Sequence, residues 1–302
     1  MVKRLFLFAG YDKYGFVDKT LLHYLRCLSD LGDIVFIMDS DANDSELDKI
    51  KQIPHVLYAS AKRHGEYDFG SYKRAYQWAD DNGLIKNYDW IYLVNDSVYG
   101  PLFNVEPLLT ELESSGADLV GPTSYRDSVT LHHVQSWFVG MSQRVATSDF
   151  LRDFMRRVSG QPTKDLIILK YEVGLSRTIM QHGYQMYTKF NTKDGDVRHD
   201  VYEAPVYVLE SGIPFIKKQA IHQVMDINRL YQVAVPSIVE DIQANIQRIG
   251  TKFTEYKEYK KIYRLTVFSI PLITIYRGVQ NSSCYKIYVF DFIPVFKSVG
   301  SR

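Results

Sequence analysis

The stretch Trp90-Ile91-Tyr92-Leu93-Val94-Asn95-Asp96-Ser97 decides the fold class of this chain. Its first five residues are apolar, as in a strand that is covered on both faces of a parallel sheet. The polar residues that follow deliver one carboxylate, that of Asp96, to the carboxyl end of the strand. Because ligands of open α/β sheets bind outside the carboxyl ends of the strands, Asp96 is a candidate site residue.

The residues before Trp90 repeat this arrangement of an apolar run with a polar end. Continuous apolar runs predict further buried strands, at 5–9, 34–38 and 56–58. Helices are predicted between the strands, at 17–31, 45–52 and 72–81. Strands and helices that alternate with short connections predict an α/β fold, with a mainly parallel, doubly wound sheet flanked by helices.

The later half of the chain is more mixed in character. Ser148 is a good N-cap for one helix, and Gly183 stops another. Two short strands and two helices are predicted in this part, at 118–121, 135–141 (antiparallel), 148–158 and 172–182.

The character of the sequence changes again near residue 224. We therefore predict a catalytic-type core over 1–223 and an extension over 224–302, with an amphipathic helix at 239–249. Within the extension, Tyr263–Pro271 is echoed by Tyr285–Pro294, and each unit is basic, aromatic and apolar before a proline. Neither unit is long enough to span a bilayer. Membrane contact, an oligomer surface, and extra strands or short helices over the core edge all stay open.

Composition limits the classes of function. The chain has 302 residues, of which 46% are hydrophobic and 24% charged, with a formal net charge of +1. This balance is typical of a soluble protein and gives no electrostatic reason to expect nucleic-acid binding. The apolar run at the start ends at Gly10, too soon for a signal peptide or a membrane span, so a cytoplasmic location is expected.

Two segments near the predicted strand ends suit a phosphorylated ligand. In the segment 63–73, glycines flank Asp68 just before a helix, and Lys73 follows one turn later. A helix start can bind phosphate through its free N–H groups, and Lys73 can neutralise phosphate charge. At the next strand end, Asn95 and Asp96 can bind a diphosphate or a divalent metal.

Two later segments suit sugar chemistry. His133 and Gln135 interrupt a predicted strand with groups that can hydrogen-bond to sugar hydroxyls, and only one of the adjacent histidines, His133, is expected to face the site. Glu172 opens the predicted helix 172–182. At a helix start its carboxylate would stay ionised and could act as general base for an acceptor hydroxyl.

These segments, in this order, resemble the rhamnan synthesis protein F family of bacterial polysaccharide glycosyltransferases. The resemblance covers roughly residues 3 to 220. The matching strings are Gly10-Tyr11-Asp12-Lys13, Tyr67-Asp68-Phe69-Gly70-Ser71-Tyr72-Lys73, Asn95-Asp96-Ser97-Val98-Tyr99-Gly100-Pro101, His133-Val134-Gln135-Ser136, Tyr171-Glu172-Val173-Gly174-Leu175-Ser176 and Ile213-Pro214-Phe215-Ile216-Lys217-Lys218.

A more distant similarity is to the large inverting family of GT-A (Rossmann-like) glycosyltransferases. It implies that Asp39 binds the base and that Glu172 is the general base. The metal-binding motif of that family ends the fourth strand, where this chain has Asn95-Asp96-Ser97 with one carboxylate. A Mg²⁺ or Mn²⁺ ion on Asp96 is therefore expected, although this departure weakens the case for tight binding.

Together these resemblances imply inverting transfer of a sugar from a nucleotide diphosphate donor to a bacterial surface polysaccharide such as O-antigen, capsule or rhamnan. dTDP-rhamnose is the first expected donor, and UDP-hexoses, including UDP-galactofuranose, are the second. The acceptor would be a glycan or lipid-linked glycan at the inner face of the membrane, with peripheral membrane contact and homo-oligomerisation open. The expected donor contacts are Tyr11, Asp39, Asp68, Lys73, Asn95, Asp96, His133 and Gln135.

Three alternatives remain open from the sequence. One is a retaining glycosyltransferase on the same fold. Another is a nucleotidyltransferase, although the segment 10–15 contains an acid and lacks the dense glycines and basic residues of such enzymes. The third is a non-catalytic glycan-binding subunit of a polysaccharide assembly complex.

Overall fold

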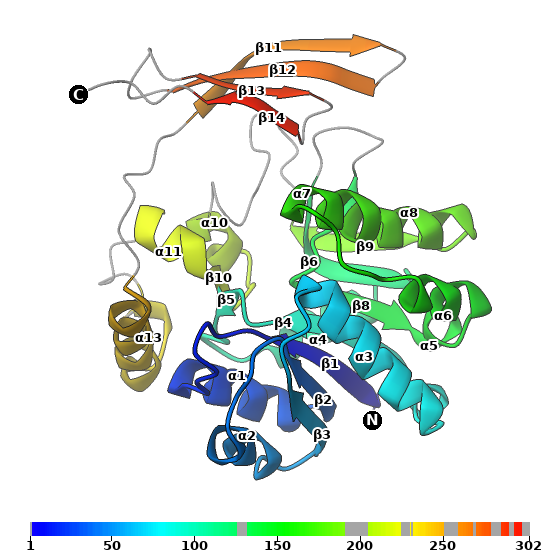
Figure 1. The fold of residues 1–302 in the computed structure, drawn as a ribbon, viewed down its shortest axis with the longest axis vertical. Coiled ribbons are helices and arrows are strands. Elements are labelled where there is room, and N and C mark those ends of the chain that lie inside the picture. Colours follow the sequence, from blue (N-terminus) through cyan, green and yellow to red (C-terminus); the bar gives the residue numbers. More distant parts are fainter. Residues whose placement is uncertain are drawn as a thin grey trace.

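The computed structural model describes residues 2–125, 132–190, 205–224, 230, 232–250, 259–267, 270–278, 285–289 and 293–297. Its core is an eight-stranded mixed sheet in the order β3-β2-β1-β4-β8-β6-β7, with β9 paired to β6 (Figure 1). The strands are β1 (Arg4–Gly10), β2 (Asp33–Met38), β3 (Val56–Ala61), β4 (Trp90–Asn95), β6 (Leu119–Tyr125), β7 (His133–Val134), β8 (Phe138–Ser142) and β9 (Met186–Phe190).

The four strands that the N-terminal apolar runs predict are parallel neighbours. β1 lies between β2 and β4, with Phe6 opposite Ile34 on one side and Tyr92 on the other. β8 then joins β4 in antiparallel orientation. The prediction of an α/β fold with a mainly parallel sheet is confirmed.

Helices cover both faces of this sheet (Figure 1). Alternate residues of β1 enter different cores: Leu5 and Leu7 pack under α3, and Phe6 and Phe8 pack under α1 and α4. The helices of the core are α1 (Lys19–Ser29), α2 (Asp44–Lys51), α3 (Tyr67–Asp81), α4 (Glu106–Glu113), α5 (Gln143–Ala146), α6 (Asp149–Arg156), α7 (Lys164–Ile167) and α8 (Gly174–Gln181).

Two expectations for the later half differ from the structure. The predicted strand 135–141 begins only at Phe138, because Gln135, Ser136 and Trp137 form a turn between β7 and β8. Trp137 anchors that turn by donating from its indole Nε1 to Thr123 Oγ1 at 3.0 Å.

The predicted helix 172–182 begins earlier than expected. Helical structure starts at α7, where Thr163 is the N-cap, and continues through a π-helical segment, Ile168–Val173, into α8. Glu172 therefore lies inside helical structure rather than at a helix start. Gly174 lies within this continuous helical structure.

A short pairing ties a distant segment to the end of β4. β5 (Val98–Tyr99) pairs with β10 (Ile216–Lys217), so that Lys217 lies opposite Val98. The backbone N–H of Leu102 also donates to Pro214 O at 2.8 Å. This pairing brings Lys217, and Lys218 at the start of α11 (Lys218–Val224), beside the turn Asn95-Asp96-Ser97.

The part after residue 224 is joined to the core through α13 (Pro236–Ile249), which confirms the helix predicted at 239–249. α13 contacts α1, and its Ile242 shares an apolar cluster with Tyr99 and Ile216. Arg248 adds ion pairs to Asp12 at 2.7 Å and to Asp18 at 3.0 Å. The domain boundary at residue 224 stays a prediction.

α10 (Pro205–Glu210) contributes Leu209 to the apolar cluster that contains Tyr99, Ile216 and Ile242.

The aromatic repeat forms a four-stranded antiparallel sheet, drawn at the top of Figure 1. Its strands are β11 (Tyr259–Val267), β12 (Ile270–Gly278), β13 (Tyr285–Val289) and β14 (Ile293–Lys297). The sequence left open whether this part would form strands or short helices, and its described residues form strands. Contact with a membrane or with a second copy stays a prediction. Among the helices that the structure describes, none has the length and apolarity to cross a bilayer.

A buried ion pair closes one end of the core. Arg4 donates to Glu113 through Nε at 2.6 Å and Nη2 at 2.7 Å, and Tyr92 donates its hydroxyl to the same carboxylate at 2.9 Å. We expect Arg4→Met to lower the free energy of unfolding by about 3–5 kcal/mol, because Glu113 would keep a buried, unbalanced charge. Urea unfolding measures this loss.

The matched control is the double variant Arg4→Met/Glu113→Gln. It removes the charge but keeps an oxygen for the Tyr92 hydroxyl, so it should regain a large part of the loss. A double variant as unstable as Arg4→Met alone would show that packing of the arginine, and not charge balance, dominates.

Candidate functional site

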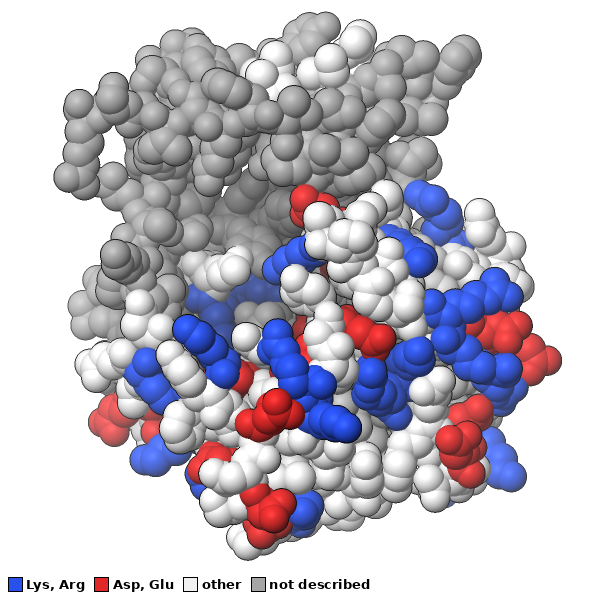
Figure 2. Space-filling view, viewed as in Figure 1, with Lys and Arg blue, Asp and Glu red and all other residues white. Residues whose placement is uncertain are grey.

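The candidate site lies at the carboxyl edge of the parallel strands. β1 leads into Tyr11, β2 into Asp39, β3 into Arg63 and β4 into Asp96, so polar residues far apart in the sequence meet at one edge. Figure 2 shows Lys and Arg side chains within and around a hollow on one face of the molecule, with Asp and Glu side chains beside them. The geometry is that of a site for a charged, polar ligand.

Asp39 organises the loop after β3. Its Oδ1 accepts from the backbone N–H of His64 at 2.7 Å and of Gly65 at 2.9 Å, and its side chain is almost completely buried. Arg63 also donates to the Asp39 carbonyl at 3.1 Å. Asp39 therefore fixes the approach of the segment that leads to α3, and this local role was not apparent from sequence.

Tyr11 offers an aromatic surface above this loop. Its side chain is 48% exposed, and the guanidinium carbon of Arg63 lies 5.2 Å from the centre of its ring. A planar cation beside an exposed ring forms a platform on which a base or a sugar face can stack.

A hydrogen-bonded chain connects α3 to the end of β4. Asn95 donates through Nδ2 to Asp68 Oδ2 at 2.8 Å, and Asn95 Oδ1 accepts from both the backbone N–H and the hydroxyl of Ser97. Burial raises the pKa of Asp68 to about 6, and the negative charge of Asp96 adds to this increase. Asp68 is thus a carboxylate whose charge changes near neutral pH.

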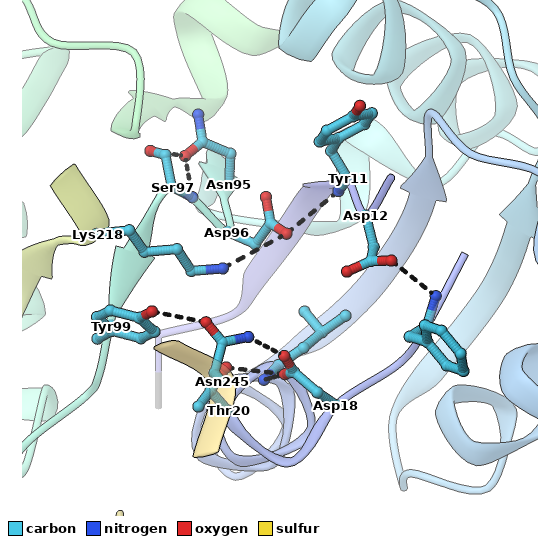
Figure 3. A network of polar contacts seen from close by, with 12 residues as sticks. Tyr11, Asp12, Asp18, Thr20, Asn95, Asp96, Ser97, Tyr99, Lys218 and Asn245 are labelled. Carbon is cyan, nitrogen blue, oxygen red and sulfur yellow. Dashed lines mark hydrogen bonds and ion pairs between the residues drawn. The ribbon is translucent and has the colours of Figure 1, made fainter. Parts of the chain in front are cut away.

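Asp96 is held between a backbone group and an ammonium group (Figure 3). Its Oδ2 accepts from the Tyr11 N–H at 3.2 Å and lies 3.9 Å from Lys218 Nζ. Burial raises the pKa of Asp96, while the charge of Lys218 opposes that shift. The same view shows the neighbouring contacts of Tyr99 and Asp18 with Asn245 of α13.

Glu172 approaches the cluster from the π-helical segment, a type of helical irregularity that is frequent at functional sites. Its Oε1 accepts from the backbone N–H of Ser136 at 2.7 Å and lies 3.7 Å from His133 Nε2. Burial alone would raise the pKa of Glu172, but the His133 imidazole and the Ser136 N–H overcome this and lower the pKa to about 2. Glu172 is therefore ionised at neutral pH, although not for the helix-dipole reason expected from sequence.

Lys217 completes the cluster. Its Nζ donates to Ser97 Oγ at 2.6 Å and lies 5.8 Å from the centre of the Trp137 ring. Burial lowers the pKa of Lys217 to about 8, and the negative charges of Glu172 and Asp68 oppose that shift. Sequence reasoning assigned no role to Lys217 or Lys218. Two adjacent lysines directly after the apolar run 213–216 were the available signal.

Two of the residues that were expected to contact the nucleotide-sugar donor are engaged in other interactions. Lys73 donates from Nζ to the carbonyl of Val158, after α6, at 2.7 Å. Gln135 Oε1 accepts from the hydroxyl of Thr123 at 2.7 Å inside the sheet. The other predicted residues contribute to the carboxyl edge or to the groups that surround it: Tyr11, Asp39, Asp68, Asn95, Asp96, His133 and Glu172.

The groups around Asp96 do not fit the expected divalent metal. Mg²⁺ and Mn²⁺ take oxygen ligands, and a bound cation would have to share Asp96 with the nearby ammonium group of Lys218. Asn95 Oδ1 already accepts from two Ser97 donors. Within the described ranges, no three His, Cys, Asp or Glu residues are grouped so as to hold a metal ion. These groups suit an ion pair between the Asp96 carboxylate and the Lys218 ammonium group.

A Rossmann-like α/β fold with acidic and basic groups gathered at the carboxyl edge defines an α/β protein whose candidate ligand site lies where open sheets of this kind bind ligands. The chain belongs to the rhamnan synthesis protein F family, whose family model matches residues 34–262. Membership implies a role in rhamnan or related polysaccharide synthesis, and it confirms the family resemblance.

One curated relative was found at low identity. The uncharacterized protein y4gN of Sinorhizobium fredii (strain NBRC 101917 / NGR234) is 19% identical over 187 residues, which cover 61% of this chain and 48% of the relative. The chain thus matches about half the length of that relative.

The environment of Glu172 makes stability depend on pH. Because its pKa in the folded chain, about 2, is below the roughly 4.3 of an unfolded glutamate, ionisation of Glu172 stabilises the fold above that value. This stabilisation is lost as the pH falls from about 4.3 towards 2. We expect Glu172→Gln to lower the free energy of unfolding at pH 7 by about 1–3 kcal/mol, with the deficit shrinking in that acidic window.

Urea unfolding at pH 7, 4 and 3 measures the deficit. Glu240→Gln, an exposed position on α13, is the matched control and should show no such change with pH. A Glu172→Gln deficit that stays constant from pH 7 to pH 3 would contradict the proposed electrostatic origin.

Proposed function

We propose that this chain is an inverting glycosyltransferase that moves a sugar from a nucleotide diphosphate donor to a hydroxyl of a bacterial surface polysaccharide. The observation that carries this proposal is the meeting of Asp68, Asp96 and Glu172 with two lysines at the carboxyl edge of the sheet. Family membership supports the polysaccharide as the class of product.

The donor nucleotide would lie across the ends of β1 to β3. The exposed ring of Tyr11 can stack on the base, and the loop that Asp39 fixes can contact the base or ribose. The diphosphate would then extend towards the turn Asn95-Asp96-Ser97. The polar groups along this path suit a ligand that has a hydrogen-bonding base and ribose at one end and a charged diphosphate at the other.

Glu172 would act as the general base. Its carboxylate accepts the proton of the acceptor hydroxyl while that oxygen forms a bond to the anomeric carbon. The bond between the anomeric carbon and the diphosphate oxygen breaks at the same time, and the configuration inverts. The Ser136 N–H and His133 orient the carboxylate for this transfer. Asp68, with its pKa near 6, is the competing proton acceptor.

The donor and the acceptor are proposed by class. dTDP-rhamnose is the first candidate donor, and UDP-hexoses, including UDP-galactofuranose, are the second. The acceptor would be a glycan or lipid-linked glycan of O-antigen, capsule or rhamnan at the inner face of the membrane. The β11–β14 sheet, with Leu265 and Ile273 exposed and opposite each other, is the candidate for peripheral contact there.

The test is a transfer assay with each of these donors and a polysaccharide acceptor, in which chromatography measures the released nucleoside diphosphate. Glu172→Gln should lower kcat by about 10²–10⁴ and leave donor affinity unchanged, because only the proton acceptor is lost. Asp68→Asn is the matched control. It should mainly raise the KM for the donor, because we propose that Asp68, through its hydrogen bond with Asn95, lies beside the donor diphosphate.

Turnover by Glu172→Gln at the wild-type rate would reject Glu172 as the base. If Asp68→Asn instead loses the larger part of kcat, the role belongs to Asp68. A product with retained configuration would replace inversion by the retaining mechanism, and equal polymer synthesis by both variants would point to a non-catalytic subunit.

A further inference from the structure

We propose that Lys217 and Lys218 together neutralise the departing diphosphate, in place of a resident divalent metal ion. This inference rests on the proposed function, since it concerns the leaving group of the same transfer. It assigns a role to two adjacent residues, one at the end of β10 and one at the start of α11.

The two ammonium groups reach the turn after β4 from adjacent positions. Lys217 ends β10 and donates to Ser97 Oγ at 2.6 Å. Lys218 begins α11, donates its backbone N–H to Ser97 O at 3.0 Å, and places Nζ 3.9 Å from Asp96 Oδ2. Both cations therefore lie at the turn Asn95-Asp96-Ser97, where the resemblance to GT-A glycosyltransferases implied a metal ion.

The surroundings keep these ammonium groups in place. Lys217 lies above the ring of Trp137 at 5.8 Å, and Lys218 lies above the ring of Tyr99 at 5.5 Å. Tyr99 is itself fixed, because its hydroxyl donates to Asn245 Oδ1 at 2.6 Å. Aromatic faces favour a cation, and packing against them limits the loss of side-chain freedom on binding. The two ammonium groups are thus held in fixed positions at the turn after β4.

The positive charges of Lys217 and Lys218 can stabilise the negative charge of a diphosphate. The charges of Lys217 and Lys218 lie near the carboxylates of Asp68, Asp96 and Glu172. A nucleoside diphosphate brings a cluster of negative oxygens, which two ammonium groups can bind as point charges. As the bond to the anomeric carbon breaks, negative charge grows on the terminal phosphate, and fixed cations stabilise that charge at the transition state.

The test compares nucleoside diphosphates with nucleoside monophosphates in excess EDTA, using UDP, dTDP, UMP and dTMP in calorimetric titrations. The wild-type chain should bind the matching diphosphate at least about tenfold more tightly than the monophosphate without metal. Lys217→Met and Lys218→Met should each remove most of that ratio and leave monophosphate affinity within about threefold. Added Mn²⁺ should change diphosphate affinity by less than about threefold.

Lys49→Met is the matched control, because Lys49 pairs with Glu46 within α2 and lies outside the cluster. Lys217→Arg and Lys218→Arg keep the charge and should retain most of the ratio. These conservative variants preserve the test if a methionine variant folds poorly, which circular dichroism would reveal.

Diphosphate binding that appears only with Mn²⁺, is abolished by Asp96→Asn and is indifferent to both lysine variants would overturn the lysine proposal alone. A wild-type chain that binds none of the four nucleotides, with or without Mn²⁺, would overturn the proposed function and this inference with it. Equal affinity for diphosphate and monophosphate in the wild type would reject the role of the lysines while leaving nucleotide binding intact.

Discussion

One balance of partly buried charges governs the carboxyl edge of the sheet. Asp68, Asp96 and Glu172 come from three separate elements, and carboxylates this close to one another are costly to ionise without nearby cations. Lys217 and Lys218 supply those cations. Because both lysines belong to a segment more than 110 residues beyond β4, the β5–β10 pairing that delivers them is as necessary to the site as the parallel strands themselves.

The first half of the fold was predictable because its signals are local. The apolar runs of β1 to β4 and the spacing of α1 each depend on a few adjacent residues, and their order leaves little choice of topology. The second half was not. A two-residue strand such as β10 has no periodicity to detect, and the π-helical segment around Glu172 contacts β7, which lies far from it in the sequence.

The sequence predicted the carboxylates of the candidate site, but it did not reveal the two lysines, Lys217 and Lys218, that lie beside them. Acids that directly follow apolar strands, such as Asp39 and Asp96, are placed by the strand itself. Lys217 is placed by tertiary pairing, so its sequence position suggested no partner. Lys73 shows the converse: its spacing from Asp68 suggested phosphate binding, yet its ammonium group satisfies the carbonyl of Val158. The charge of a lysine and its spacing from an acid in the sequence do not determine which group its ammonium contacts.

The central claim is that a nucleoside diphosphate binds across the carboxyl edge, with its phosphates at the turn after β4. A crystal structure of the full chain with UDP or dTDP tests this most directly. The account predicts phosphate oxygens within hydrogen-bonding distance of Lys217 and Lys218, and a base beside Tyr11 and the loop held by Asp39. A nucleotide bound at any other part of the chain would contradict it.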